Sequence, residues 1–429
     1  MSCVAHGFGV GACSAPRPHM SRSAGVPGSR GVCSSRASAS SNVPSTSTST
    51  KASNTTHRVR DGWYKWRGHR VHFERGGADP STAKRHLVFL HGFGVGSFHY
   101  EHQLDNLSSD GTTCVWALDF CGQGKSWPCR DDDGADDNSS NYSPPDYLDT
   151  ETAPPPGFRY SVDTWRDQAE YFLSQIVKAE GGAFVAGNSL GGFVGTYLTA
   201  SKTNTNASPP LVRGLLLLNA TPFWGFVPSD TNGIARRLTP WDGSLPAPGW
   251  IKAPFKLYWN SFRSIDNVKG LLSLVYADGK DRVDDTLVKN IIAPTNRQPA
   301  LSAFCSVVWS PKSAMDFDDM LSAIKNQSGT NRTQIALVYG KDDPWVVPLW
   351  GQKLKRQVPR VHYYELPGVG HCPAHEAPEI TNCVISKWIQ WCDDQSENKS
   401  EKTNPPGQYL IDGAPRNVFE KIAEWRESV

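Results

Sequence analysis

The five residues Gly187-Asn188-Ser189-Leu190-Gly191 constrain this chain more than any other segment. The apolar run Ala183–Ala186 before them is typical of a buried strand, and Leu190–Ala200 after them has the apolar spacing of a helix. A G-x-S-x-G match alone is a weak signal, but this strand–turn–helix setting predicts a sharp, strained turn that presents a serine. The helix also points its positive amino end at developing negative charge. We therefore predict that Ser189 is a nucleophile.

Apolar and β-branched runs alternate with helical patterns, which predicts a mostly parallel α/β sheet. Helical spacing is found between the predicted strands, for example over Val162–Val177. Two short leading strands are expected to be antiparallel, at Trp63–Trp66 and Val71–Glu74. The further expected strands are His86–Leu90, Thr113–Asp119, Ala183–Gly187, Leu215–Asn219, Gln334–Tyr339 and Val361–Glu365. Together with the turn at Ser189, this pattern indicates the α/β-hydrolase fold, with a mostly parallel central sheet and a helical cap domain.

Two interruptions divide the predicted core. Residues 130–156 are acidic and proline-rich, so we expect a loop or disordered insertion there. Residues 221–331 have a helical pattern and separate one predicted strand from the next, and an insertion at that place lies over the carboxyl ends of the strands, where ligands bind. We interpret it as the cap. The predicted organisation is an N-terminal segment over 1–60, core segments over 61–220 and 332–395, the cap over 221–331, and a polar linker with a C-terminal helix over 396–429.

Aromatic side chains crowd the predicted cap, and most of them are expected to form its own core. They are Phe223, Trp224, Phe226, Trp241, Trp250, Phe255, Tyr258, Trp259 and Phe262.

The first sixty residues contain no Asp or Glu, and their arginines stand among many serines and threonines. This composition is typical of an organellar transit peptide, and the Ser/Thr content favours a chloroplast over a mitochondrion. A plain disordered tail is the alternative. Without Arg17, Arg22, Arg30, Arg36 and Lys51 the formal charge falls from +2 to about −3, so nothing argues for nucleic-acid binding.

Cysteine usage argues against a disulfide framework or a zinc site. Seven of the ten cysteines lie beyond the predicted transit peptide, an odd number with no CxxC pair, and a reducing compartment such as the stroma fits them. No run of 18 apolar residues exists, so no membrane span is expected.

A serine hydroxyl attacks only when a base takes its proton, so a histidine is required. His371 follows the last predicted strand, where the fold brings the loop back over the serine, and we assign it as the base. His375 is the rival. Its place just before Glu376 and Pro378 suggests a surface or helix-entry role.

The base needs a carboxylate to orient it, and Asp342 and Asp343 both follow the strand Gln334–Tyr339. Asp343 has the position that the fold commonly uses and keeps the chain order Ser, Asp, His. Asp342 is expected to be a solvated turn residue, with the reverse assignment left open.

The oxyanion of acyl transfer requires hydrogen-bond donors. We assign the backbone N–H of Leu190, after the nucleophile, and of Phe93, in the loop after the strand His86–Leu90. An ordinary glycine turn is the alternative for that loop. The segment Asp119–Ser126 is predicted to be structural, packed under the site.

Several segments resemble the pheophytinases over a region from about Trp63 to Cys392. They are Gly92–Glu101, Gly187–Gly192, Leu217–Phe226, Asp343–Val346 with Pro348–Gly351, and Gly370–Pro373. The run Asn-Ala-Thr-Pro-Phe-Trp-Gly-Phe is the most specific, because generic catalysis does not need it. Two features depart from the family: His91, where the plant enzymes have proline, and the acidic insertion after Arg130.

The resemblance implies hydrolysis of the phytyl ester of a chlorophyll-derived pigment in chloroplasts, at the stroma or the thylakoid, without metal or organic cofactor. The implied partner is a tetrapyrrole phytyl ester, and peripheral contact with the thylakoid membrane is expected. Phe223, Trp224, Phe226 and Trp345 are the expected substrate-binding residues, although Trp345 could equally be a loop residue packed under the cap.

Three other functions stay open. Chlorophyllase activity on magnesium-bearing chlorophyll and esterase activity on another substrate use the same residues. A non-catalytic ligand receptor on this fold is the alternative from a different class. A small closed pocket would favour the receptor, whereas an open pocket large enough for a tetrapyrrole would favour the enzyme.

Overall fold

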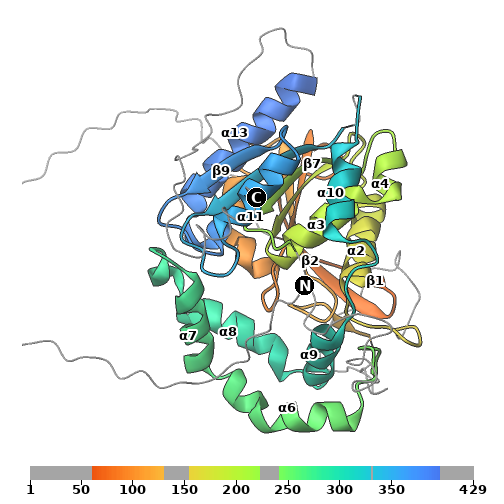
Figure 1. Ribbon diagram of the computed structural model, residues 1–429, viewed down its shortest axis with the longest axis vertical. Helices are drawn as coiled ribbons and strands as arrows, with labels where there is room; N and C mark the ends of the chain where they lie inside the picture. Colours follow the sequence, from red (N-terminus) through yellow and green to blue (C-terminus); the bar gives the residue numbers. More distant parts are fainter. Residues whose placement is uncertain (1–59, 130–153, 223–240, 330–331, 397–429) are drawn as a thin grey trace, which may run out of the picture. The chain divides into compact units, whose positions relative to one another are not determined.

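A single sheet organises the computed structural model, which describes residues 60–129, 154–222, 241–329 and 332–396 (Figure 1). The strand order is β1-β2-β4-β3-β6-β7-β8-β9, and the short β5 pairs with β2. Pairs that involve β1, β2 or β5 are antiparallel and all the other pairs are parallel, which confirms the predicted sheet. The strands are β1 (Arg60–Trp66), β2 (His69–Gly77), β3 (Arg85–Leu90), β4 (Thr113–Leu118), β5 (Trp127–Pro128), β6 (Ala183–Asn188), β7 (Val212–Leu218), β8 (Gln334–Gly340) and β9 (His362–Leu366).

Helices bury both faces of the parallel strands, which explains why these strands are apolar at nearly every position. Leu87 and Phe89 of β3 pack into one apolar cluster and Val88 and Leu90 into the other, and the neighbouring strands alternate in the same way. The first face is covered by η1 (Ser97–Tyr100), α1 (Glu101–Asn106), α12 (Pro373–Glu376) and α13 (Pro378–Ser396). The second is covered by α2 (Val162–Tyr171), η2 (Phe172–Val177), α3 (Leu190–Ala200), α10 (Phe317–Lys325) and α11 (Pro348–Gln357); the short α4 (Lys202–Asn206) follows α3.

The order of the chain through the sheet reverses between β3 and β6. From β3 the chain passes to β4 on one side and then to β6 on the other. Ligands bind at such a switch point, beyond the carboxyl ends of the strands. Leu90 of β3 is paired with Gly187 of β6, so the loop after β3 and Ser189 leave the sheet side by side. The loops after β7, β8 and β9 leave the same edge and carry Asn219, Asp343 and His371.

Helices between β7 and β8 form the region predicted to be a cap (Figure 1). They are α6 (Gly249–Phe262), α7 (Ile265–Val275), η3 (Lys280–Arg282), α8 (Asp285–Ile292), η4 (Ala293–Asn296), α9 (Ala300–Trp309) and α10. α6 packs on α9 and α7 on α8, whereas α10 packs beside α3 on the sheet.

An apolar cluster joins α6 to α9 through Ile251, Phe255 and Cys305. Trp250, Tyr258 and Phe262 are exposed instead, so the expectation of a core role was wrong for these three. No helix in the described residues is long and apolar enough to cross a membrane.

Candidate active site

Ser189 lies in a strained turn between β6 and α3. Its φ of 51° and ψ of −116° are unusual for any residue other than glycine. A Cβ on Gly187 would collide with the carbonyl of Gly191, and one on Gly191 with the carbonyl of Leu90, so the turn requires both glycines. Ser189 is the one partly exposed residue between 182 and 200. The turn therefore presents this side chain alone above a buried strand and helix.

His371 and Asp343 form a buried pair at the same edge of the sheet. The Nδ1–H of His371 donates to Oδ2 of Asp343 across 2.7 Å, and the two residues are 6% and 3% exposed. Asp342 is exposed, and its carboxylate accepts the backbone N–H of Gly368 at 2.9 Å. Of the two candidate acids, Asp343 is therefore the one beside the histidine.

Three further donors hold the Asp343 carboxylate in place. The backbone N–H groups of Trp345 and Val346 donate to Oδ1 at 2.8 and 3.0 Å, and Nδ2 of Asn219 donates to Oδ2 at 2.7 Å. Oδ1 of Asn219 accepts the backbone N–H of Gly340 at 2.8 Å, which fixes the orientation of the amide. Asn219 was not predicted to be a site residue. Its signals were its place at the end of the predicted strand Leu215–Asn219 and at the start of the run Asn-Ala-Thr-Pro.

Asn188, the residue before Ser189, ties the turn to the histidine loop. Its side-chain amide donates to the carbonyl oxygens of Leu218 and His371, both at 2.9 Å. Within the described residues the Ser189 hydroxyl forms no hydrogen bond. Catalytic hydrogen bonds are commonly long in unliganded enzymes and tighten when substrate binds.

The loop after β3 is held by side chains and backbone from the segment after β4. Nδ1 of His91 donates to the carbonyl of Gly92 at 2.6 Å, and Nε2 accepts the backbone N–H of Phe120 at 2.9 Å. Burial lowers the pKa of His91, which keeps the ring neutral, as these two roles require. Gln123 accepts the backbone N–H of Gly94 at 2.9 Å.

The loop that carries Phe93 and the turn that carries Leu190, the two predicted oxyanion donors, both lie next to Ser189. A Cβ on Gly92, next to Phe93, would lie 3.4 Å from the Cβ of Ser189. Leu190 is the first residue of α3, so its N–H has no partner within the helix. The two loops that carry Phe93 and Leu190 thus approach each other at the nucleophile.

A polar network holds the segment Asp119–Ser126 in place. His72 donates to Asp119 Oδ2 at 2.7 Å and to Asp61 Oδ1 at 2.6 Å. Ligand atoms of Asp61, His72 and Glu74 lie within 4.8 Å of one another, as in a metal site. The Lys125 ammonium group, 2.8 Å from Asp61 and 3.9 Å from Glu74, already supplies positive charge there. We interpret the cluster as an ion-pair network.

His375 is buried, so the expected surface role was wrong, although it does lie in α12 at the entry to α13. Its ring stacks on His99 at 4.7 Å, and its Nδ1 contacts the Tyr276 hydroxyl at 3.0 Å. Burial lowers the pKa of His375 to about 4, so the ring is neutral near pH 7.

Glu376 joins the cap to the histidine loop, a role that the sequence analysis missed. Its Oε1 accepts the backbone N–H of Ala277 at 2.6 Å, and its Oε2 that of Gly370 at 2.8 Å. The N–H of His371 also donates to the carbonyl of Val275 at 2.8 Å. The end of α7 is thus bonded directly to the segment that carries the histidine.

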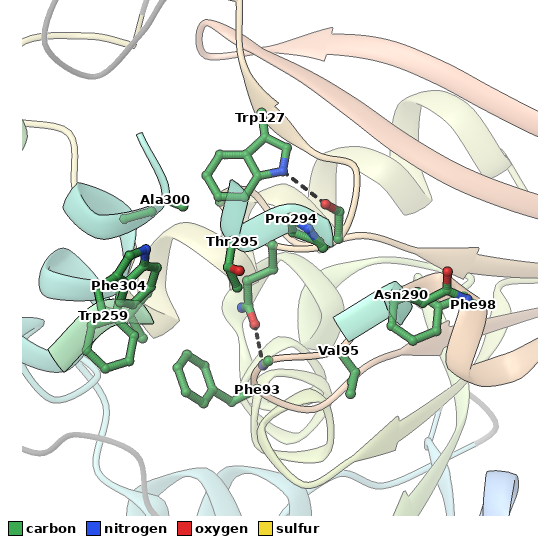
Figure 2. Close-up of a pocket in the computed structure, with 16 residues that line it drawn as sticks. Phe93, Val95, Phe98, Trp127, Trp259, Asn290, Pro294, Thr295, Ala300 and Phe304 are labelled. Atoms are coloured by element: carbon green, nitrogen blue, oxygen red, sulfur yellow. Dashed lines mark hydrogen bonds between the residues drawn. The ribbon is translucent and has the colours of Figure 1, made fainter. Parts of the chain in front are cut away.

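An apolar pocket opens between the loop after β3 and the cap (Figure 2). Its volume, including the open mouth, is about 510 Å³. Figure 2 shows Phe93 below Trp259 and Phe304 of the cap, with Phe98 and Asn290 opposite. The lining is almost entirely apolar, which suits a hydrocarbon ligand.

The four predicted substrate-binding residues differ in outcome. Phe223, Trp224 and Phe226 lie outside the described residues. Trp345 is 58% exposed, and its ring meets the His371 ring edge-on with centroids 5.4 Å apart. An exposed aromatic ring beside the histidine is available to a ligand rather than packed under the cap.

Comparisons with known proteins agree with this geometry. Residues 87–382 match the model of the alpha/beta hydrolase family. Pheophytinase, chloroplastic, of Arabidopsis thaliana is 38% identical over 326 residues, which are 75% of this chain and 64% of that protein. This match confirms the resemblance found in the motifs, although the chain spans less than two thirds of that relative. A serine hydrolase involved in carbazole degradation shares the fold, with a TM-score of 0.51 and 16% identity over 78% of this chain and 99% of that one.

Proposed function

The chain belongs to the alpha/beta hydrolase family, and we propose that it is a serine carboxylic ester hydrolase that removes phytol from pheophytin. One observation carries this proposal: the strained turn presents Ser189 at the sheet edge where His371 and Asp343 form a buried 2.7 Å pair. The likeness to the Arabidopsis pheophytinase directs the choice of substrate.

Acylation follows from the roles of these side chains. His371 takes the proton of Ser189, and the oxygen attacks the carbonyl carbon of the propionate ester. Asp343 holds the imidazole with its proton on Nδ1 and stabilises the imidazolium. The N–H groups of Phe93 and Leu190 bind the oxyanion. The intermediate collapses, and phytol leaves with the proton from His371.

Deacylation reuses the same groups. His371 deprotonates a water molecule, which attacks the acyl carbon of the pigment ester on Ser189. The acid product, pheophorbide, leaves, and Ser189 regains its proton. Every proton in this sequence moves through His371, so the scheme requires no cofactor.

The pocket beside Phe93 is suited to an apolar portion of this substrate. Phytol is a long hydrocarbon alcohol, and Trp259 and Phe304 offer it an aromatic wall. Trp345, exposed beside His371, is placed to contact the macrocycle. We also propose a chloroplast location, from the name of the relative and the acid-free, Arg- and Ser-rich residues 1–60.

The test is to incubate the protein with pheophytin and with chlorophyll separately and to measure phytol. We expect release from pheophytin. Release from chlorophyll alone would indicate a chlorophyllase, and binding of pigment without release a receptor. Release from neither would refute the dephytylation proposal. A fusion of residues 1–60 to a reporter, offered to isolated chloroplasts, tests the location, which is wrong if the reporter is not imported.

A further inference from the structure

Exposed apolar side chains are concentrated on the helices α6 and α7. Ten large apolar side chains are exposed among the described residues, and seven of them fall between residues 250 and 274. Leu257 and Tyr258 are 81% and 72% exposed. The ring of Phe262 packs against Phe304 of α9, so we define the α6–α7 surface as the other six: Trp250, Leu257, Tyr258, Ile265, Leu271 and Leu274. Such a cluster on two consecutive helices marks an interaction site rather than scattered surface residues.

Two apolar stripes run along α6. Ile251, Phe255 and Trp259, at spacings of four, face the protein and pack toward α9. Trp250 and Leu257, seven residues apart, stand on a second side that no described residue covers. A helix that is apolar on two sides requires a partner for the outer one.

The net charge of the segment that carries the α6–α7 surface indicates which kind of partner binds there. Between Trp250 and Leu274, which bound this surface, the chain has four basic residues and one acid, Asp266; the basic residues are Lys252, Lys256, Arg263 and Lys269. Tryptophan and tyrosine with flanking lysines are the side chains that favour the interface of a lipid bilayer. Basic residues next to an apolar face add attraction to anionic headgroups.

The inner side of α6 leads to the pocket. Trp259, on the side of α6 that faces the protein, lines the pocket together with Phe93 and Phe304. One helix therefore has an apolar side that no described residue covers and a side that lines the apolar pocket next to Phe93.

We propose that the α6–α7 surface docks this protein on a lipid bilayer that carries anionic headgroups. Docking places the outer side of α6 in the interface, and an apolar substrate dissolved in the bilayer then reaches the pocket without crossing bulk water. The docking step does not depend on ester cleavage, so it can be tested without any turnover.

The experiment measures co-sedimentation of the full chain with vesicles of phosphatidylcholine, with and without phosphatidylglycerol. The double variant Leu257→Ser/Leu274→Ser should lower the vesicle partition coefficient at least about tenfold. Lys256→Glu should lower it by about tenfold on the anionic vesicles and little on the neutral ones. Ile380→Ser and Lys387→Glu are the matched controls, because both residues are exposed on α13 and neither belongs to the α6–α7 surface.

Residues 1–60 are basic and can bind anionic vesicles themselves, but every variant carries them equally. Equal partition of the wild type and the double variant would overturn the proposal. The proposal would also be overturned if the wild type were a dimer in the absence of lipid and the double variant a monomer, because the surface would then bind a second copy of the chain. Hydrolysis of a short, water-soluble ester should be the same in all variants, so loss of docking is distinguishable from loss of catalysis.

Discussion

Replacing Asp343 with asparagine tests the assignment of the acid, and the structure predicts how the variant fails. Oδ1 of Asp343 faces two backbone N–H groups, from Trp345 and Val346, so the amide oxygen of the asparagine must take that position. The NH₂ group is then directed at Nδ1 of His371 and at the NH₂ of Asn219. His371 can meet this donor only with Nδ1 as acceptor, which moves its proton to Nε2.

A histidine protonated at Nε2 cannot accept the proton of Ser189. The expected loss in kcat is about 10⁴-fold, which corresponds to about 5.4 kcal/mol of transition-state stabilisation. The two opposed NH₂ groups should also lower the free energy of unfolding by about 1–3 kcal/mol. Phytol release gives kcat, and urea denaturation confirms that the variant is folded at the assay temperature.

Asp342→Asn is the matched control, since this carboxylate is exposed and accepts a single backbone N–H from Gly368 among its partners. It should keep kcat within about tenfold of the wild type, because the carboxylate that bonds Nδ1 of His371 is that of Asp343. If Asp342→Asn loses as much activity as Asp343→Asn, or if Asp343→Asn keeps a tenth of the wild-type rate, the reasoning is refuted.

Three more outcomes follow from the structure. Ser189→Ala should abolish phytol release while pigment binding, followed by absorbance titration, stays unchanged; retained turnover would place the nucleophile elsewhere. Asn219→Ala removes a donor to Asp343 and should lower the free energy of unfolding, measured in urea, by about 1–3 kcal/mol. An unchanged free energy of unfolding would contradict the importance of this contact. Burial lowers the pKa of His72, but the hydrogen bonds to Asp119 and Asp61 have the larger effect, and the net pKa is raised. The protonated His72 therefore stabilises the fold fully below about pH 6.5, and this stabilisation is lost as the pH rises through the raised pKa. The stability of the wild type should therefore fall more between about pH 6 and about pH 9 than that of His72→Gln, and equal slopes in urea titrations would contradict this assignment.

Features encoded by neighbouring residues were predictable from the sequence. The turn at Ser189 depends on two glycines, a preceding strand and a following helix, all within about twenty residues. The histidine and aspartate loops each follow a buried apolar strand that periodicity reveals. The choice between Asp342 and Asp343 was harder, because adjacent residues in one turn differ only in the direction of their side chains.

Contacts between distant segments were not predictable. Asn219 bonds a residue 124 positions away, and Glu376 bonds Ala277 from 99 positions away. No local pattern encodes such pairs, since strand order and register bring them together. The exposure of Trp250 and Tyr258 was missed for a related reason: apolar residues on a helix predict burial, but the sequence does not show whether a partner covers each side.

Hydrolysis of pheophytin in oxygen-18 water by the wild type and by Ser189→Ala tests the central claim most directly. Attack of Ser189 on the carbonyl breaks the acyl–oxygen bond, so the account predicts the label in the carboxylate of pheophorbide and none in phytol. It also predicts no product from Ser189→Ala. Label in phytol, or labelled pheophorbide formed by Ser189→Ala at the wild-type rate, would contradict it.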